Sequence, residues 1–388
     1  MSMDACIKTY FENSFTFEEI LEFLRNRDGY NISLSTLKRH LKKMALIRRP
    51  TQNVRCDTRV LNDAVRLELT GSGCGVGYRR IHRSLIRKGY ICRRDDVRKL
   101  IKSIDPEGVE SRRKRRLVRR KYVTQGPNYV WHIDGHDKLK PFGFSIHGCI
   151  DGFSRRIIWL EVCTSNKDPE VIAKFYLDTV KQHGFIPLQI KADDGTEHSL
   201  IQPIHVYLRT LDGTHPNLNS FSITSSPLNQ RIEAFWSHLQ RDRIGWWKQL
   251  FQDLVDLGLF SIEDPALLEN IRFCFMELLR KDLTKITEDW NSHIISPSRY
   301  DGIRGRPDTM YFLPHLHHKE DYKINIDDDD IDEFYPSITT PLIDVSEEFR
   351  EFARDVLTLN DDVNYPPENA EEAINLYIYL KQKIHEFS

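Results

Sequence analysis

Four acidic residues stand at three points of the chain from which they could meet in space. Asp134 lies in the stretch YVWHIDGHDKL, Asp193 and Asp194 follow the apolar run FIPLQIKA, and Glu233 follows SPLNQRI. Converging carboxylates are costly unless divalent cations neutralise them. Mg²⁺ prefers such oxygen ligands, and two ions can activate an attacking oxygen and stabilise a leaving one. The residues therefore indicate cutting or joining of phosphodiesters, with either Asp193 or Asp194 as the central ligand.

The sequence around these acids predicts the elements that must position them. Residues 129–139, 144–162 and 185–194 are rich in β-branched and aromatic residues and are separated by turn formers, which favours strands. Apolar residues recur at helical spacing in 169–184, so a helix joins the second and third of these segments. A helix over 198–211, a fifth strand over 220–226 and a long helix over 229–254 follow. This order of elements is that of a ribonuclease-H-like core with a mixed sheet.

The N-terminal part predicts two basic helix pairs. Residues 15–44 have apolar residues at helical spacing on both sides of an Asp28-Gly29 stop. The pattern repeats over 77–105. Their polar faces carry the DNA-binding candidates Lys38, Arg39, Lys42, Lys43, Arg79, Arg80, Arg83, Arg87, Arg93 and Arg94. We expect helix-turn-helix units, and the alternative is a pair of ordinary helical hairpins with solvated basic faces.

A basic run over residues 111–125 joins these helices to the predicted core. Its charges include Arg112, Arg113, Lys114, Arg115 and Arg116. Three roles fit this composition: a solvated linker, a grip on backbone phosphate, or a nuclear import signal. The sequence does not rank them.

The net charge of −1 conceals a strong asymmetry along the chain. Residues 1–130 sum to +16, residues 131–300 to −4 and residues 301–388 to −13. A basic front half is typical of proteins that bind polyanions. The sequence has no uncharged apolar run long enough to predict a membrane span, and its N-terminus does not resemble a secretory signal. Seven cysteines without a CxxC pair indicate reduced thiols in an intracellular protein.

These stretches resemble known families. GYRRIHRSLIRKGY is similar to the helix-turn-helix that precedes the catalytic domain of bacterial insertion-sequence transposases. YVWHIDG, GCIDGFSRRIIWLEV, KADDGTEH and SSPLNQRIEAFW resemble the core of the retroviral-type integrase and DDE transposase superfamily. The likeness covers roughly residues 75–312, including NSHIISPSRYDGIRGRPDTMY, and is greater to eukaryotic transposon-derived integrase-core proteins than to retroviral enzymes.

The resemblance implies roles for particular residues. It places the catalytic and metal-binding acids at Asp134, Asp193 and Glu233, with Asp194 in an asparagine-like position of the turn. It implies Mg²⁺ or Mn²⁺, two ions, and in-line attack by water or a DNA 3′-hydroxyl. The partners would be double-stranded DNA and further copies of the chain, and the location the nucleus if the source is eukaryotic. The chain departs from retroviral integrases in a longer spacing between Asp193 and Glu233, in lacking their zinc module, and in its acidic C-terminus.

We therefore expect helix-turn-helix regions over 1–55 and 56–110, the linker 111–125, the catalytic core 126–250, a helical extension 251–312 and an acidic region 313–388. The predicted function is that of a DNA integrase or transposase. The alternatives are a DNA-binding protein that has lost transposition and a ribonuclease-H-like nuclease that only hydrolyses.

Other features are expected to have ordinary structural roles. His132, His136, His198 and His238 fit partly exposed packing positions, and the alternative is contact with the substrate or with the metal-binding acids. GWWKQLF (245–251) fits a core or interface helix, with base stacking as the alternative. Asp137 and Asp151 fit turn or surface roles, residues 315–318 a loop and residues 326–334 a solvated acidic segment.

Overall fold

A computed structural model describes residues 2–13, 15–46, 56–70, 73, 75–113, 124–211, 220–224, 229–296, 303–338, 343–358 and 364–387. The chain divides into two compact units, which are described separately. The first contains residues 1–127 and 289–321, and the second contains residues 128–288 and 322–388.

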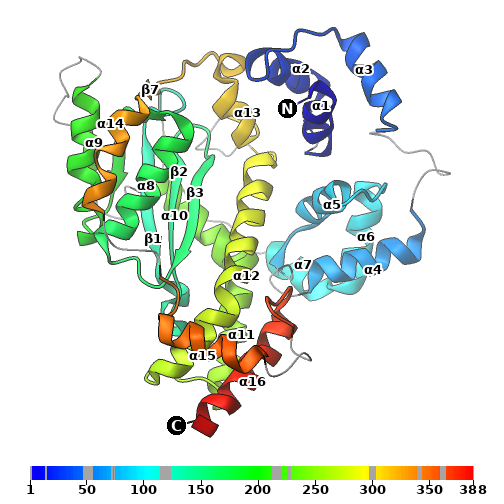
Figure 1. The fold of residues 1–388 in the computed structure, drawn as a ribbon. Helices are drawn as coiled ribbons and strands as arrows, with labels where there is room; N and C mark the ends of the chain where they lie inside the picture. The colour runs from blue at the N-terminus through cyan, green and yellow to red at the C-terminus, as the bar shows by residue number, and fades with distance from the viewer. Residues whose placement is uncertain are drawn as a thin grey trace. The chain divides into compact units, whose positions relative to one another are not determined.

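Helices make up the described secondary structure of the first unit, apart from one isolated β-bridge between Ile295 and Gly305 (Figure 1). Its first three helices pack around a cluster of aromatic and aliphatic side chains that includes Phe23, Leu24 and Leu37. The second helix begins with a capping box, because Thr16 and Glu19 exchange side-chain to backbone hydrogen bonds. The helices are α1 (Met3–Glu12), α2 (Phe17–Asn26) and α3 (Leu34–Lys43).

A second helical group follows and has a hydrophobic cluster of its own. Val65, Ile81, Leu85, Val97 and Ile101 lie at its centre. Its helices are α4 (Thr58–Leu69), α5 (Tyr78–Arg87), α6 (Arg94–Ile104) and α7 (Pro106–Arg113). The N-terminal part is thus all-helical, as the sequence predicts.

The same unit includes the segment that follows residue 288. Within it α13 (Pro307–Phe312) lies against α2, where Thr309 donates a hydrogen bond to Glu19 at 2.9 Å. Arg306 approaches the same carboxylate at 3.4 Å. Residues remote in sequence therefore complete the N-terminal unit.

A mixed five-stranded sheet forms the centre of the second unit, in the order β3-β2-β1-β5-β6. The first three strands form an antiparallel meander, and β5 and β6 run parallel to β1. The strands are β1 (Trp131–His136), β2 (Ser145–Asp151), β3 (Ile157–Cys163), β5 (Ile190–Ala192) and β6 (Phe221–Ile223). The parallel crossover between β1 and β5 confirms the predicted ribonuclease-H-like arrangement.

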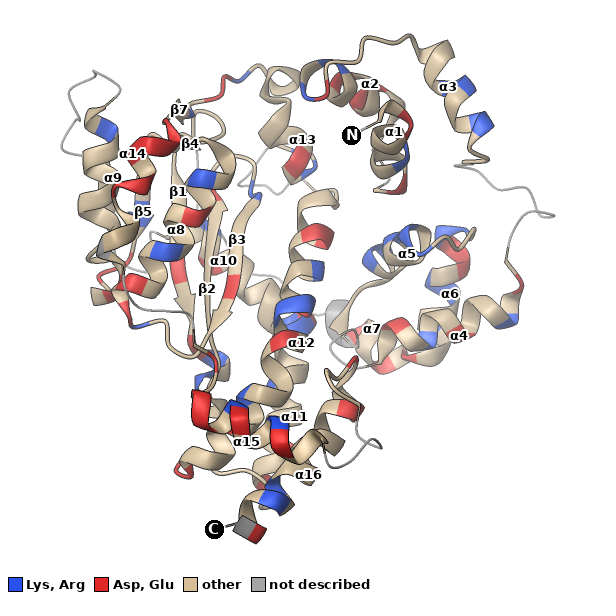
Figure 2. Cartoon of the chain, viewed as in Figure 1, with Lys and Arg blue, Asp and Glu red and all other residues tan. Residues whose placement is uncertain are grey.

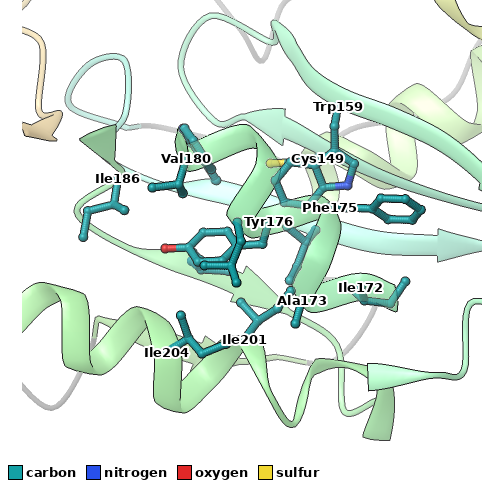
Figure 3. Close-up of a cluster of buried hydrophobic side chains, with 14 of the residues drawn as sticks. Cys149, Trp159, Ile172, Ala173, Phe175, Tyr176, Val180, Ile186, Ile201 and Ile204 are labelled. Atoms are coloured by element: carbon teal, nitrogen blue, oxygen red, sulfur yellow. The ribbon is translucent and has the colours of Figure 1, made fainter. Parts of the chain in front are cut away.

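The hydrophobic core lies between one face of this sheet and two helices, α8 (Pro169–His183) and α9 (Ile201–Thr210). Figure 3 shows Tyr176 and Ile172 of α8 beside Cys149 and Trp159 of the sheet and Ile201 of α9. α8 begins at the cap Asp168 followed by proline and ends at Gly184, which has φ 70°. The buried side of α8 is the apolar side that the sequence predicts.

The opposite face of the sheet is covered by α10 (Gln230–Leu239). Residues Gln240–Ile244 form a π-helical stretch that leads directly into α11 (Gly245–Asp256), so the predicted long helix is interrupted but not broken. Trp247 is buried and donates a hydrogen bond to Asp282 of α12 (Pro265–Ser292), as expected for a core residue.

The acidic C-terminal region contributes to the core of the second unit. The strand β7 (Ile324–Asn325) pairs with β4 (Phe185–Ile186), and Ile326 and Ile331 are buried in the main cluster. Most acidic side chains over 326–334 are exposed, as expected, but the segment is not wholly solvated, because Ile326 and Ile331 are buried and anchor α14 (Asp328–Asp332). The last helices of the chain are α15 (Glu347–Thr358) and α16 (Ala370–Phe387). Just before α15, Asp344 accepts two hydrogen bonds of 2.6 Å from Arg280.

Two further findings bear on the composition. The six cysteines in the described part of the chain are free thiols. Among the helices described, none combines the length and apolarity needed to cross a membrane.

Candidate active site

Asp134 lies on the face of β1 that α10 covers, and its side chain is buried. Its Oδ2 accepts a 2.8 Å hydrogen bond from the indole of Trp236. Burial, together with the negative charges of Asp193 and Glu233, raises the pKa of Asp134 to about 7, against the effect of the Trp236 hydrogen bond. The fold therefore brings the three predicted acids close enough to repel one another.

Asp193 reaches this place because of the parallel register between β1 and β5. Trp131 pairs with Ile190, and His132 pairs with Lys191. Two residues further along each strand come Asp134 and Asp193, at the same edge of the sheet. The neighbouring Asp194 is exposed, whereas Asp193 is half-buried. The side chain of Asp194 therefore lies at the surface of the protein.

Glu233 is positioned by the start of α10, which is tied to β1. The cap residue Asn229 donates a hydrogen bond to the main-chain oxygen of Ile133 at 3.0 Å. Burial lowers the pKa of His132 to about 3, so its ring is neutral, and its Nδ1 lies 2.6 Å from Oδ1 of Asn229, to which it donates. These buried bonds hold the first turn of α10, and with it Glu233, over the end of β1.

Trp236 requires an unusually small residue on the adjacent strand. Gly148 pairs with Asp134, and a Cβ atom at Gly148 would lie 2.8 Å from the ring of Trp236. The other side of the indole stacks on His136 at a centroid distance of 4.9 Å. Glycine at this position thus leaves room for the hydrogen bond that orients Asp134.

The donor atoms at Asp193 fit a divalent cation. One ligand atom each from Asp193, Glu197 and His198 lies within 4.8 Å of the others. Oδ1 of Asp193 and Nδ1 of His198 are buried without a hydrogen-bond partner among the described residues. The carboxylate of Glu197 folds over Gly195, where a Cβ atom would lie 2.4 Å away. An acidic group with an unpaired buried oxygen is the environment that a cation stabilises.

The histidines around the acids are more deeply buried than the sequence suggests. His132, His136 and His198 are buried, so the expectation of partly exposed packing residues is wrong for these three. His132 contacts Asn229, His136 stacks on Trp236, and His198 lies beside Asp193. His238 is half-buried, and its Nδ1 lies 2.7 Å from Nη2 of Arg241.

Several supporting residues escape sequence reasoning. Asn229, Trp236, His147 and Trp159 belong to patterns that also describe ordinary helix caps and core strands. One signal could have been used for Trp236: a glycine in the middle of a buried strand indicates the close approach of another group.

Figure 2 marks the basic residues of α3, α5 and α6 in blue, and the predicted DNA-binding residues among them differ in their exposure. Lys38, Arg39, Lys42 and Lys43 of α3 are exposed, as are Arg79, Arg93 and Arg94. In contrast, three arginines of α5 face the segment that begins at Asp289. Arg87 forms an ion pair with Asp289, and Arg80 lies over the ring of Trp290. Burial and the positive charge of the nearby Arg306 lower the pKa of Arg83 to about 9. The side chains of Arg112 and Arg113, and all of Lys114, Arg115 and Arg116, lie outside the described residues.

The fold and the acidic group define a ribonuclease-H-like domain of the polynucleotidyl transferase type. A family model described as an integrase core domain matches residues 121–320, and the chain belongs to this family. Integrase-type folds imply DNA binding, and such domains typically use divalent metals. A comparison with curated proteins finds no match.

Proposed function

We propose that the protein is a DNA integrase or transposase that cleaves DNA phosphodiesters and transfers strands. The observation that supports this most is the convergence of Asp134, Asp193 and Glu233: strand register brings Asp193 to Asp134, and the charges of Asp193 and Glu233 add to the effect of burial on the pKa of Asp134. Asp134, Asp193 and Glu233 would hold Mg²⁺ or Mn²⁺. Two bound ions would activate the attacking oxygen and stabilise the leaving oxygen of an in-line displacement.

The chain's own residues would prepare the acids for this role. Trp236 orients Asp134, and Asn229 fixes Glu233 at the start of α10. The half-buried position of Asp193 leaves one side of the group accessible to a polyanionic substrate. We propose the domain limits 1–55, 56–110, 111–125, 126–250, 251–312 and 313–388 as functional regions, with helix-turn-helix units before the core. The requirement to join two DNA ends together favours a homo-oligomer.

A strand-transfer assay tests the activity. Purified protein with Mg²⁺ and labelled DNA ends should give joined products, and Glu233→Gln should reduce them about 10³-fold, because a neutral amide cannot replace a charged ligand. Cleavage without joining would favour the alternative of a hydrolytic nuclease. Absence of both products with the unaltered protein would favour a DNA-binding protein that has lost the reaction.

DNA binding should depend on the exposed basic face of α3. Replacing Lys38 and Lys42 by alanine should weaken binding to unrelated duplexes alike. It should also lower the slope of log K against log salt by about 0.9 for each phosphate that the protein no longer neutralises. Fluorescence anisotropy over a series of salt concentrations measures this slope.

A matched control for that prediction comes from basic residues elsewhere in the chain. Arg350 and Lys383 each pair with a glutamate on their own helix, and their replacement by alanine should leave the slope unchanged. An equal effect of both double substitutions would refute a specific role for α3.

A further inference from the structure

A row of four side chains runs from the interior of the sheet to Asp193. Trp159 of β3 lies with its indole Nε1 3.1 Å from Nδ1 of His147 on β2. Nε2 of His147 lies 3.4 Å from Nε2 of His198, and Nδ1 of His198 lies 3.5 Å from Oδ1 of Asp193. The first three side chains are buried, with exposed fractions of 5%, 0% and 3%.

The chemistry of the first member fixes the direction of the whole row. An indole N–H can only donate, so Nδ1 of His147 accepts. Complete burial holds the pKa of His147 well below its usual value, so the ring is neutral and its one proton is on Nε2. His147 therefore donates to Nε2 of His198. Because Nε2 of His198 accepts this hydrogen bond, the ring proton of His198 is on Nδ1, which lies 3.5 Å from Oδ1 of Asp193.

We propose that His198 is a positioning residue for cation binding, whose Nδ1–H faces the carboxylate of Asp193 and orients it toward the cation. Trp159, acting through His147, keeps His198 in the tautomer that can do this. The inference rests on the proposed function, because it takes Asp193 as a metal ligand. It also removes His198 from the possible ligands in the group with Asp193 and Glu197, since a protonated nitrogen cannot coordinate a metal.

The row begins at a rigid anchor. Trp159 belongs to the hydrophobic cluster between the sheet and α8 (Figure 3). Its ring lies nearly parallel to that of His147, with an interplanar angle of 14°, and makes an edge contact with Trp131. Trp159 on β3 thus determines the tautomer of His198, although β2 and β1 lie between β3 and β5, the strand that Asp193 follows.

Nuclear magnetic resonance of the metal-free protein tests the direction. Proton–nitrogen spectra of the histidine rings, assigned by comparison with His147→Gln and His198→Asn, distinguish protonated from unprotonated ring nitrogens. We expect Nε2–H at His147 and Nδ1–H at His198. An Nε2–H tautomer at His198 would overturn the proposal.

Mn²⁺ binding, followed by electron paramagnetic resonance, tests the consequence. His198→Leu removes both donor and acceptor and should weaken Mn²⁺ binding about 10- to 100-fold, the range typical of partners that orient a metal ligand. His198→Asn keeps an acceptor for His147 and a donor for Asp193, so it should restore most of the affinity. His205→Leu removes another buried histidine on the same face of the sheet, one that lies 2.8 Å from the hydroxyl of Tyr176, and should leave the affinity unchanged.

The outcomes separate the inference from the function on which it rests. Equal Mn²⁺ affinities for His198→Leu and the unaltered protein would overturn the role of His198 alone. Nitrogen coupling from a histidine to the bound Mn²⁺, lost in His198→Leu, would show direct ligation and would also overturn it. If the unaltered protein binds no Mn²⁺ while strand transfer is also absent, the metal site itself fails, and the role of His198 fails with it.

Discussion

Replacing Asp193 by asparagine is expected to lower strand transfer about 10³-fold, because an amide cannot supply the charge that a central metal ligand contributes to the transition state. Asp193 acts electrostatically on Asp134, it lies beside Asp134 by strand register, and it is half-buried whereas Asp194 is exposed. The measurement is the rate of joined-product formation with Mg²⁺ in excess.

Asp194→Asn is the matched control for this substitution. It makes the same chemical change one residue away, at an exposed position in the turn. A surface substitution of this kind changes free energies by about 0.5 kcal/mol, so activity should stay within about threefold of the unaltered protein. Loss of activity in Asp194→Asn with activity kept in Asp193→Asn would show that the neighbouring aspartate is the ligand.

Replacing Asp134 by asparagine is expected to have opposite effects on activity and on stability. Strand transfer should be lost, because the proposed function makes this acid one of the metal ligands. The metal-free protein, however, should become more stable above pH 7. Its folded state raises the pKa of Asp134 from 3.8 to about 7, which means that folding opposes ionisation of this group. Asparagine removes that cost, of the order of 2–4 kcal/mol, and can still accept the hydrogen bond from Trp236.

The pH dependence of this gain follows from the direction of the pKa shift. A group with a raised pKa in the folded state destabilises the protein progressively as pH rises from its unfolded to its folded value. The difference in unfolding free energy between Asp134→Asn and the unaltered protein should therefore grow from about pH 4 to about 7 and then level off. Denaturant unfolding in EDTA at several pH values measures it. A gap that is constant with pH would contradict the electrostatic cause.

The order of strands and helices in the core could be predicted from local patterns, since strands and amphipathic helices have distinct periodicities. The candidate acids followed from their places at the ends of those elements. The choice of Asp193 over Asp194 needed a resemblance, because strand alternation alone left both open. In the structure Asp193 is half-buried and Asp194 is exposed, a difference that depends on which strands become neighbours.

Contacts between distant segments could not be predicted in this way. Nothing local to Trp159 or His147 indicates that they lie in a row with His198, because that depends on the pairing of β2 with β3 and on the loop after β5. The same holds for Arg80 and Arg87, whose basic pattern predicts an exposed face although both lie against Asp289 and Trp290. A periodicity identifies the polar face of a helix but not what that face contacts.

The burial of Ile326 and Ile331 bears on the shortest fragment of the integrase core domain that can fold by itself. The family likeness ends at residue 320, before β7 and α14. A fragment cut at that limit would leave β4 without its partner strand and would open the side of the core that these isoleucines close. The segment that matches the family model and the segment that folds as a unit therefore differ in length, because the acidic C-terminal region helps to keep the five-stranded sheet folded.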